Sequence, residues 1–188
     1  MGAVNTVVVE DGQLVGHNTD GSGWAWGFKR ALPHANLGRV VLLGAGGAGA
    51  AIAHAVLRLG AQHLSIVDAQ PERAAQLARD VNALYGDRAE AADIGAAMAQ
   101  ATGLIHATPT GMDKLPGLPL DAQLLRPTMW VSEVVYFPLD TALLKAARAM
   151  GCSVSDGGGM AVGQAVGAFE LFTGVAPDAS RMDTHFRR

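Results

Sequence analysis

The chain of 188 residues is predicted to form an α/β fold, a doubly wound parallel sheet with helices on both faces. From about residue 38 to residue 156, short apolar stretches typical of strands alternate with longer stretches of helical periodicity. Parallel strands need crossover connections, which are nearly always right-handed, so few topologies remain. We expect one principal domain, because the composition is 49% hydrophobic and the length suits a single core.

The first elements along the chain are two short strands, TVVVE (6–10) and QLVGH (13–17). They flank Asp11-Gly12, a dipeptide typical of tight hairpin turns. An isolated hairpin of two strands is marginally stable in water. We therefore expect residues 1–20 to be the remnant of an N-terminal lobe that lies mostly outside this chain.

A connecting helix is predicted next, within residues 21–37. GSGWAWGFKRAL places Trp24 and Phe28 at helical spacing, and Pro33 ends the pattern. The alternation of strands and helices then begins, and it runs through RVVLL, GAGGAGAAIAHAVLRLG, HLSIVD, PERAAQLARDVNALYG, GLIHAT, TMWVSEVVY, TALLKAARAMG and CSVSD. After it, residues 157–188 are predicted to be a helical segment that packs back on the N-terminal lobe, with Gly174 ending the main helix.

A glycine motif follows the first strand of this alternation and opens its first helix. In VVLLGAGGAGAA, Gly44 permits a tight turn, Gly46 lets the backbone approach a pyrophosphate, and Gly49 lets the helix lie close to the strand. Free amides at the helix N-terminus would face the anion. The pattern predicts a Rossmann-type dinucleotide site, although in a glycine-rich chain it can also serve packing alone. The predicted site comprises Gly44, Ala45, Gly46, Gly47, Ala48 and Gly49.

Asp68 ends the next strand, about 20 residues after the motif, where a carboxylate accepts both hydroxyls of the adenosine ribose. The alternative is a helix N-cap before Pro71. The same carboxylate repels a 2′-phosphate, and no arginine stands immediately beside it. We therefore predict that residues 38–156 bind NAD in preference to NADP.

Composition argues against several other classes of protein. The formal net charge is −3 and the basic residues are scattered, so a nucleic-acid partner is not expected. No apolar stretch is long enough to span a bilayer and no signal peptide is evident, which favours a cytoplasmic protein without a membrane partner. Cys152 is the single cysteine, and no His, Cys and carboxylate cluster has the spacing of a metal site.

Six motifs follow one another along the chain: GAVNT, GxxxGxNTDGxG, GAGGA, ATPxGM, VVYxPxxTxLL and GxxMxxxQAxxAFxxxTG. Together they resemble the shikimate/quinate dehydrogenase family, from Gly2 to Gly174. The resemblance implies an NAD(P)-dependent enzyme of two lobes, in which the substrate lobe precedes GAVNT. It also implies reversible hydride transfer between a ring hydroxyl of a cyclic hydroxy-acid, quinate or shikimate, and the nicotinamide.

The resemblance places the family's catalytic aspartate at Asp20 and its lysine partner upstream of this chain. Oxidation of a secondary alcohol needs a base near the hydroxyl, which suits this role. Without the resemblance, a structural role for Asp20, as a helix cap or a turn residue, is as well supported as a role in a functional site. The implied substrate-binding residues are Asn5, Thr19, Tyr136 and Gln164. The implied cofactor contacts outside the glycine motif are Thr108, Pro109, Met112 and Gly159.

Two positions depart from the family pattern. His106 stands where the family commonly has Asn, which would alter a hydrogen bond at the cofactor edge, and Glu133 stands where it commonly has Asp. A single histidine at a strand end is more often structural than catalytic. The lysines of the chain are Lys29, Lys114 and Lys145, and none is expected to replace the upstream lysine.

The rival to a dehydrogenase is a non-catalytic dinucleotide-binding or ligand-binding regulatory module of the same fold, because fold alone does not fix function. For either reading we expect the chain of 188 residues to bind NAD and to turn over slowly or not at all. We also expect self-association through apolar surface on the hairpin and the last helix.

Overall fold

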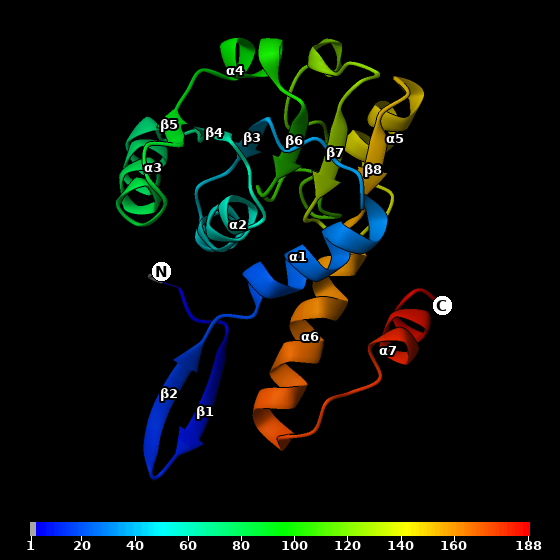
Figure 1. The fold of residues 1–188 in the computed structure, drawn as a ribbon. Helices are drawn as coiled ribbons and strands as arrows, with labels where there is room; N and C mark the ends of the chain where they lie inside the picture. The colour runs from blue at the N-terminus through cyan, green and yellow to red at the C-terminus, as the bar shows by residue number, and fades with distance from the viewer. Residues whose placement is uncertain (1–2) are drawn as a thin grey trace.

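The computed structural model describes residues 3–188, so Met1 and Gly2, where the GAVNT motif begins, lie outside the described residues. Its centre is a parallel sheet of six strands in the order β5-β4-β3-β6-β7-β8 (Figure 1). The strands are β3 (Arg39–Leu43), β4 (His63–Val67), β5 (Ala89–Ala91), β6 (Gly103–His106), β7 (Trp130–Glu133) and β8 (Ser153–Ser155). This order reverses direction between β3 and β6, as in a doubly wound Rossmann-type sheet. The predicted fold class is confirmed.

Helices cover both faces of the sheet because alternate residues of each buried strand point to opposite sides. On β3, Leu42 belongs to a core cluster with Ile52 of α2, whereas its neighbour Val41 packs in a second cluster with Met98 of α4 and Leu143 of α5. The crossover elements are α2 (Gly47–Arg58), α3 (Pro71–Tyr85), α4 (Ile94–Gln100), the 3₁₀ turn η1 (Ala122–Leu124) and α5 (Ala142–Ala149).

The N-terminal hairpin has the predicted strands, β1 (Thr6–Glu10) and β2 (Gln13–His17). Asp11 and Gly12 both have positive φ, 50° and 77°, which is the backbone of the turn that best matches hairpin twist. The hairpin pairs only with itself among the described strands and projects away from the central sheet (Figure 1).

Two long helices, α1 (Asp20–Ala31) and α6 (Gly157–Thr173), lie against each other. Helix α1 lies between the hairpin and the sheet, and α6 runs away from the sheet on the same side of it as the hairpin (Figure 1). They approach closely at glycines, since a Cβ added to Gly27 would lie 2.6 Å from the carbonyl carbon of Gly159. Trp24 anchors α1 to the sheet, because its buried indole donates a hydrogen bond of 3.0 Å to the Ser132 hydroxyl.

The C-terminal part continues from α6 to the short helix α7 (Ala179–Phe186). The main helix ends at Gly174 with a φ of 67°, as the sequence predicts. Arg187 then returns to the start of α6 and donates two hydrogen bonds to the Asp156 carboxylate. No helix within residues 3–188 is both long and apolar enough to cross a membrane.

Candidate functional site

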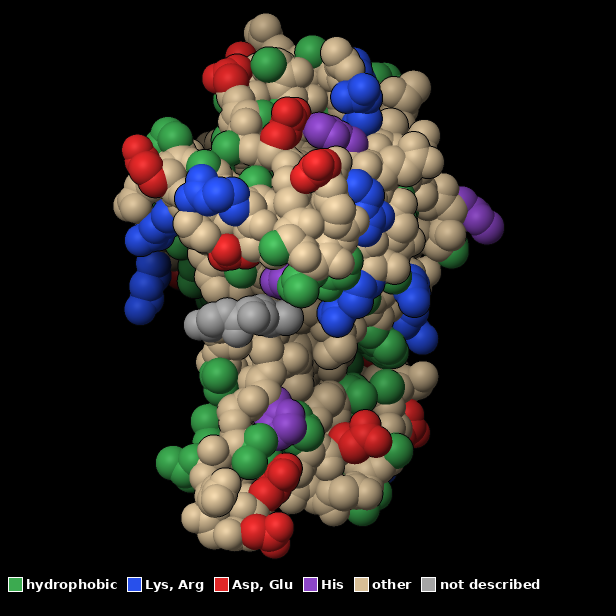
Figure 2. All heavy atoms as spheres, turned by 60° about the vertical axis from the view of Figure 1, so that its left-hand side comes forward, with side chains coloured by type: hydrophobic (Ala, Val, Ile, Leu, Met, Phe, Trp, Pro, Cys, Tyr) green, Lys and Arg blue, Asp and Glu red, His purple; other side chains and the backbone are tan. Residues whose placement is uncertain are grey.

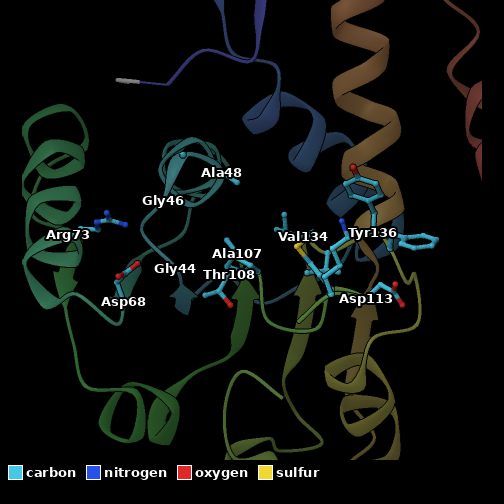
Figure 3. A pocket seen from close by; sticks show the side chains of 16 residues that line it. Gly44, Gly46, Ala48, Asp68, Arg73, Ala107, Thr108, Asp113, Val134 and Tyr136 are labelled. Atoms are coloured by element: carbon cyan, nitrogen blue, oxygen red, sulfur yellow. The ribbon is translucent and has the colours of Figure 1, made fainter. Parts of the chain in front are cut away.

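A cavity of about 810 Å³ opens at the carboxyl ends of β3, β4, β6 and β7 (Figure 3). Its lining comes from the segments that directly follow these strands, including Gly44, Asp68, Thr108 and Val134. The strand order reverses between β3 and β6, and in open α/β sheets ligands bind at the carboxyl ends beside such a reversal. This cavity therefore lies where the fold itself favours a ligand.

The three motif glycines have different physical reasons to be glycine. A Cβ on Gly44, whose φ is 110°, would lie 2.6 Å from the Ala107 carbonyl oxygen, and one on Gly49 would lie 2.0 Å from the Gly44 carbonyl oxygen. A Cβ on Gly46 would meet no atom within 4 Å, yet Gly46 lines the cavity. The fold requires Gly44 and Gly49, whereas the open space at Gly46 fits a ligand that approaches the backbone.

The N-terminus of α2 faces this space without a cap of its own. Gly46 is the N-cap residue, no side chain within residues 3–188 caps the helix, and its first turn holds no acidic residue. Gly47 and Ala48 line the cavity beside it (Figure 3). Unpaired amides and the positive end of the helix dipole attract an anion such as a pyrophosphate.

Asp68 follows β4 and lines the same cavity. One carboxylate oxygen accepts the Ala45 amide at 2.7 Å and the other accepts the Gln70 amide at 2.9 Å. The N-cap of α3 is Gln70, so the capping alternative for Asp68 is wrong. Each carboxylate oxygen has a second lone pair, so Asp68 still has capacity to accept ligand hydroxyls.

Arg73 lines the cavity and was not among the predicted site residues. It lies in the first turn of α3, and Figure 3 shows its side chain at the same end of the cavity as Asp68. The signal was present, because a residue two positions after Pro71 lies in the first turn of the predicted helix. Arg73 is not an immediate sequence neighbour of Asp68, so the prediction that no arginine stands beside Asp68 did not include it.

The rest of the cavity lining comes from the segments after β6 and β7. Thr108, Pro109 and Met112, predicted to contact the cofactor, all line it. Tyr136, predicted to contact the substrate, lines it as well and is 51% exposed. The structure thus brings these four residues together with the glycine turn.

Asn5, Thr19 and Asp20 form a separate polar cluster where the hairpin meets α1. The Asn5 amide donates to the Thr19 hydroxyl at 3.0 Å and to the Asp20 carboxylate at 2.9 Å, while its oxygen accepts the Thr19 backbone amide. Both N–H groups of Asn5 therefore serve to hold its neighbours in place. Asp20 is the first residue of α1, where the helix dipole stabilises a carboxylate.

Gln164 and Gly159 lie on α6. A Cβ on Gly23 of α1 would lie 2.4 Å from the backbone nitrogen of Gln164, and a Cβ on Gly167 would lie 3.2 Å from the Thr19 side chain. Helix α6 thus passes the polar cluster, and Gln164 is half-buried beside α1, so its side chain is not obliged to pair inside the protein. Gly159, predicted to contact the cofactor, lies outside the cavity and is buried against Gly27.

Beneath the cavity, two buried polar side chains from adjacent strands meet. His106 on β6 and Glu133 on β7 are paired in register and joined by a hydrogen bond of 2.7 Å. The other ring nitrogen of His106 lies 2.6 Å from the Thr108 hydroxyl. Among residues 3–188, no group of three or more His, Cys, Asp or Glu side chains is arranged to hold a metal ion.

Comparison with known proteins places this site in a family. A family model described as the shikimate 5′-dehydrogenase C-terminal domain matches residues 157–183. Shikimate dehydrogenase (NADP(+)) of Streptomyces avermitilis is 61% identical over 97% of this chain and 64% of its own length. Quinate/shikimate dehydrogenase (NAD(+)) of Corynebacterium efficiens is 47% identical over 99% of this chain and 67% of its own length.

Solved structures that are similar to this chain are named as dehydrogenases of the same kind. A quinate dehydrogenase from Corynebacterium glutamicum in complex with NAD superposes with a TM-score of 0.93 at 46% identity, covering 99% of this chain and 68% of that one. A shikimate 5-dehydrogenase from Listeria monocytogenes in complex with shikimate and NAD gives 0.87 at 32% identity, covering 98% of this chain and 68% of that one. The chain spans about two thirds of the length of these relatives, and over that length both its sequence and its fold are similar to theirs: it belongs to the shikimate/quinate dehydrogenase family.

Proposed function

We propose that this chain is the coenzyme-binding part of an NAD(P)-dependent dehydrogenase that acts on a cyclic hydroxy-acid such as quinate or shikimate. The observation that carries the proposal is the cavity at the strand-order reversal, where the uncapped α2 N-terminus, Asp68 and the Thr108 loop face one space. The named activities of the relatives support the same reaction class.

In this proposal the α2 N-terminus would hold the pyrophosphate and Asp68 would hold the adenosine ribose. The nicotinamide half would then lie along the loop that contains Thr108 and Met112 and toward Tyr136. Figure 3 shows Tyr136 at the end of the cavity opposite Asp68, with Thr108 between them. Bound there, the coenzyme supplies the hydride acceptor, and the protein supplies position and charge.

We propose NAD as the preferred coenzyme because the Asp68 carboxylate would repel a 2′-phosphate. Arg73, at the same end of the cavity, would favour NADP instead, since a guanidinium attracts a phosphate. Relatives named for NAD and for NADP are both similar to this chain, so their names do not decide the preference. In this proposal the preference is set by the balance between Asp68, which repels a 2′-phosphate, and Arg73, which attracts it.

For the chemical step we propose that Asp20 orients the reacting hydroxyl, with Asn5 holding Asp20, and with Thr19, Gln164 and Tyr136 contacting the substrate. Asn5 supports this role because it donates to both Thr19 and Asp20. The lysine that would pair with Asp20 is expected upstream of this chain. Of the lysines within the chain, Lys114 lines the coenzyme cavity and Lys145 lies beside Asp140 on the surface. We therefore propose that the chain of 188 residues binds coenzyme but turns over slowly or not at all.

The test is a spectrophotometric assay of coenzyme reduction with quinate and with shikimate, in parallel with calorimetric titration of NADH. Both are carried out on this chain and on a chain extended at its N-terminus to the length of the relatives. Binding by both chains with turnover only by the extended one supports the proposal. Binding without turnover by both would favour the regulatory module, and absence of binding in both would refute a dinucleotide site.

A further inference from the structure

The short helix α7 places an aromatic ring against the wall of the coenzyme cavity. Phe186, the last residue of α7, has its ring centroid 6.4 Å from that of Tyr136, and the two ring planes are tilted by 58°. This separation and tilt lie within the range of favourable aromatic pairs. Tyr136 lines the cavity, whereas Phe186 does not. Phe186 therefore contacts the lining from outside the cavity.

The backbone on both sides of Tyr136 is held by other elements. A Cβ added to Gly157, the first residue of α6, would lie 2.3 Å from the Val135 carbonyl oxygen, so this helix starts directly against the residue before Tyr136. On the other side, the Phe137 carbonyl accepts a backbone amide of the loop after β6 at 3.3 Å. The Tyr136 side chain is 51% exposed, and its aromatic partner among the described residues is Phe186. The backbone thus fixes where the Tyr136 ring is attached, and Phe186 restricts where the ring points.

The end of α7 is anchored by the residue that follows Phe186. The Arg187 guanidinium donates to both oxygens of Asp156, the N-cap residue of α6, at 2.8 Å and 3.1 Å, and to a carboxylate one turn earlier in α7 at 2.8 Å. Bidentate pairs of this kind are stronger and more directional than single contacts. A Cβ on Gly158 would lie 3.1 Å from the Phe186 ring, so the ring rests on the first turn of α6. The end of α7 is therefore docked on the same turn of α6 that lies beside Tyr136.

The position of Tyr136 in the cavity gives this contact a consequence for the coenzyme. In the proposed function the α2 N-terminus and Asp68 take the pyrophosphate and the adenosine ribose, which leaves the far part of the cavity for the nicotinamide half. Tyr136 lies at the end opposite Asp68 (Figure 3). Ordering a side chain on binding opposes affinity, so a Tyr136 ring that is already held in place favours the ligand.

We propose that Phe186 is a positioning residue for coenzyme binding, because it holds the Tyr136 ring at the end of the cavity that the nicotinamide half would occupy. The inference rests on the proposed dinucleotide function and deepens it. It gives α7 a role in ligand binding although Phe186 does not itself line the cavity. Arg187 contributes by fixing the end of α7 on α6.

The test is a double-mutant cycle on the chain of 188 residues, read by calorimetric titration with NADH and with ADP-ribose, which lacks the nicotinamide. The variants are Phe186→Ala, Tyr136→Ala and the double variant, with Phe186→Tyr as the conservative replacement that keeps the ring. Arg187→Ala releases the same end of α7 by a second route. It replaces Phe186→Ala in the cycle if that variant does not fold.

A matched control is available at the other end of α6. Phe172 is also a partly exposed phenylalanine, 63% exposed against 39% for Phe186, and it does not line the cavity. It lies about 22 Å along the helix from Gly157, at 1.5 Å per residue. Phe172→Ala therefore makes the same chemical change away from Tyr136. We expect it to leave the affinity for both probes unchanged.

We expect Phe186→Ala to weaken NADH binding about fivefold, because the coenzyme itself must then order the Tyr136 ring. Tyr136→Ala should weaken NADH binding at least as much, and adding Phe186→Ala to it should have no further effect, because Phe186 acts through Tyr136. ADP-ribose binding should stay within about twofold, and Phe186→Tyr should bind NADH like the wild type. A purely structural role of α7 would instead weaken both probes and add to the loss in Tyr136→Ala.

Wild-type NADH affinity in Phe186→Ala or in Tyr136→Ala, an additive loss in the double variant, or an equal loss for ADP-ribose would each overturn the inference while leaving the dinucleotide site intact. A wild-type chain that binds neither probe would overturn the proposed function, and this inference with it.

Discussion

Replacing Gly46 and Gly49 by alanine, one at a time, tests which glycine is needed for coenzyme binding and which is needed for the stability of the fold. Gly46 has an extended backbone, with φ −79° and ψ −167°, that any residue adopts, and a Cβ there meets no atom within 4 Å. Glycine is the better N-cap, but alanine restricts the unfolded chain, so the free energy of unfolding should change by less than about 1 kcal/mol. The new methyl group would occupy the space that a pyrophosphate needs. NADH binding should therefore weaken at least tenfold, about 1.4 kcal/mol or more.

Gly49→Ala should have the opposite profile. Its Cβ would lie 2.0 Å from the Gly44 carbonyl oxygen, a backbone atom of the preceding turn, so helix and turn must separate. Alanine gains about 1 kcal/mol of helix propensity over glycine, but the forced separation outweighs it. We expect a net loss of about 2 kcal/mol in the free energy of unfolding.

The assays are urea denaturation followed by circular dichroism and calorimetric titration with NADH, on both variants and the wild type. Wild-type affinity in Gly46→Ala would refute the placement of the pyrophosphate at the α2 N-terminus. Wild-type stability in Gly49→Ala would refute the close contact between helix and turn.

Three further predictions concern the coenzyme preference, acid stability and self-association. Asp68→Ala should erase the preference for NADH over NADPH in parallel titrations, whereas Arg73→Ala should weaken NADPH more than NADH; the reverse pattern would contradict the roles assigned to them. Burial alone would raise the pKa of Asp156, but hydrogen bonds and charge from Arg187 and amides of the α6 N-terminus lower it. A folded-state pKa that is lowered contributes stability that is present above about pH 4 and is lost as the pH falls through that pKa. The Arg187→Ala variant lacks most of this contribution, so between about pH 5 and pH 2 its free energy of unfolding, measured by urea denaturation, should fall less than that of the wild type. Leu14 is 78% exposed on the hairpin, and Leu14→Glu should shift the chain toward monomer in sedimentation velocity; a wild type that is monomeric at high concentration would contradict self-association.

Apolar surface on the hairpin and the end of α6 is the basis of the last of these predictions. Val7 and Val9 are 51% and 70% exposed, and Phe172 near the end of α6 is 63% exposed. Figure 2 shows this part of the molecule below the larger sheet-containing body, joined to it by a narrower waist. Grouped exposed apolar side chains of this kind tend to find partners.

Features that depend on local sequence were predictable. Asp11-Gly12 between two alternating stretches fixed the hairpin, and the glycine motif after a buried strand located the α2 turn, because both need particular backbone conformations. The position of Asp68 beside the glycine turn was predictable in the same way, since its distance along the chain from the motif reflects one crossover unit.

Features that depend on tertiary contacts were not predictable. Glu133 meets His106 only because β6 and β7 are neighbours in register, which the sequence does not state. Gly159 was assigned to the cofactor, yet it permits α6 to approach Gly27 of α1, a pairing of distant segments. Arg73 reaches the cavity because the first turn of α3 is directed toward it.

Hydrogen exchange followed by mass spectrometry, with and without NAD, tests the central claim most directly, because it locates the coenzyme on the chain. We predict that NAD slows exchange in the segments that contain Gly46, Asp68 and Thr108, and that the hairpin strands Thr6–Glu10 and Gln13–His17 remain unchanged. Unchanged exchange at Gly46 in the presence of saturating NAD, or protection confined to other parts of the chain, would contradict the account.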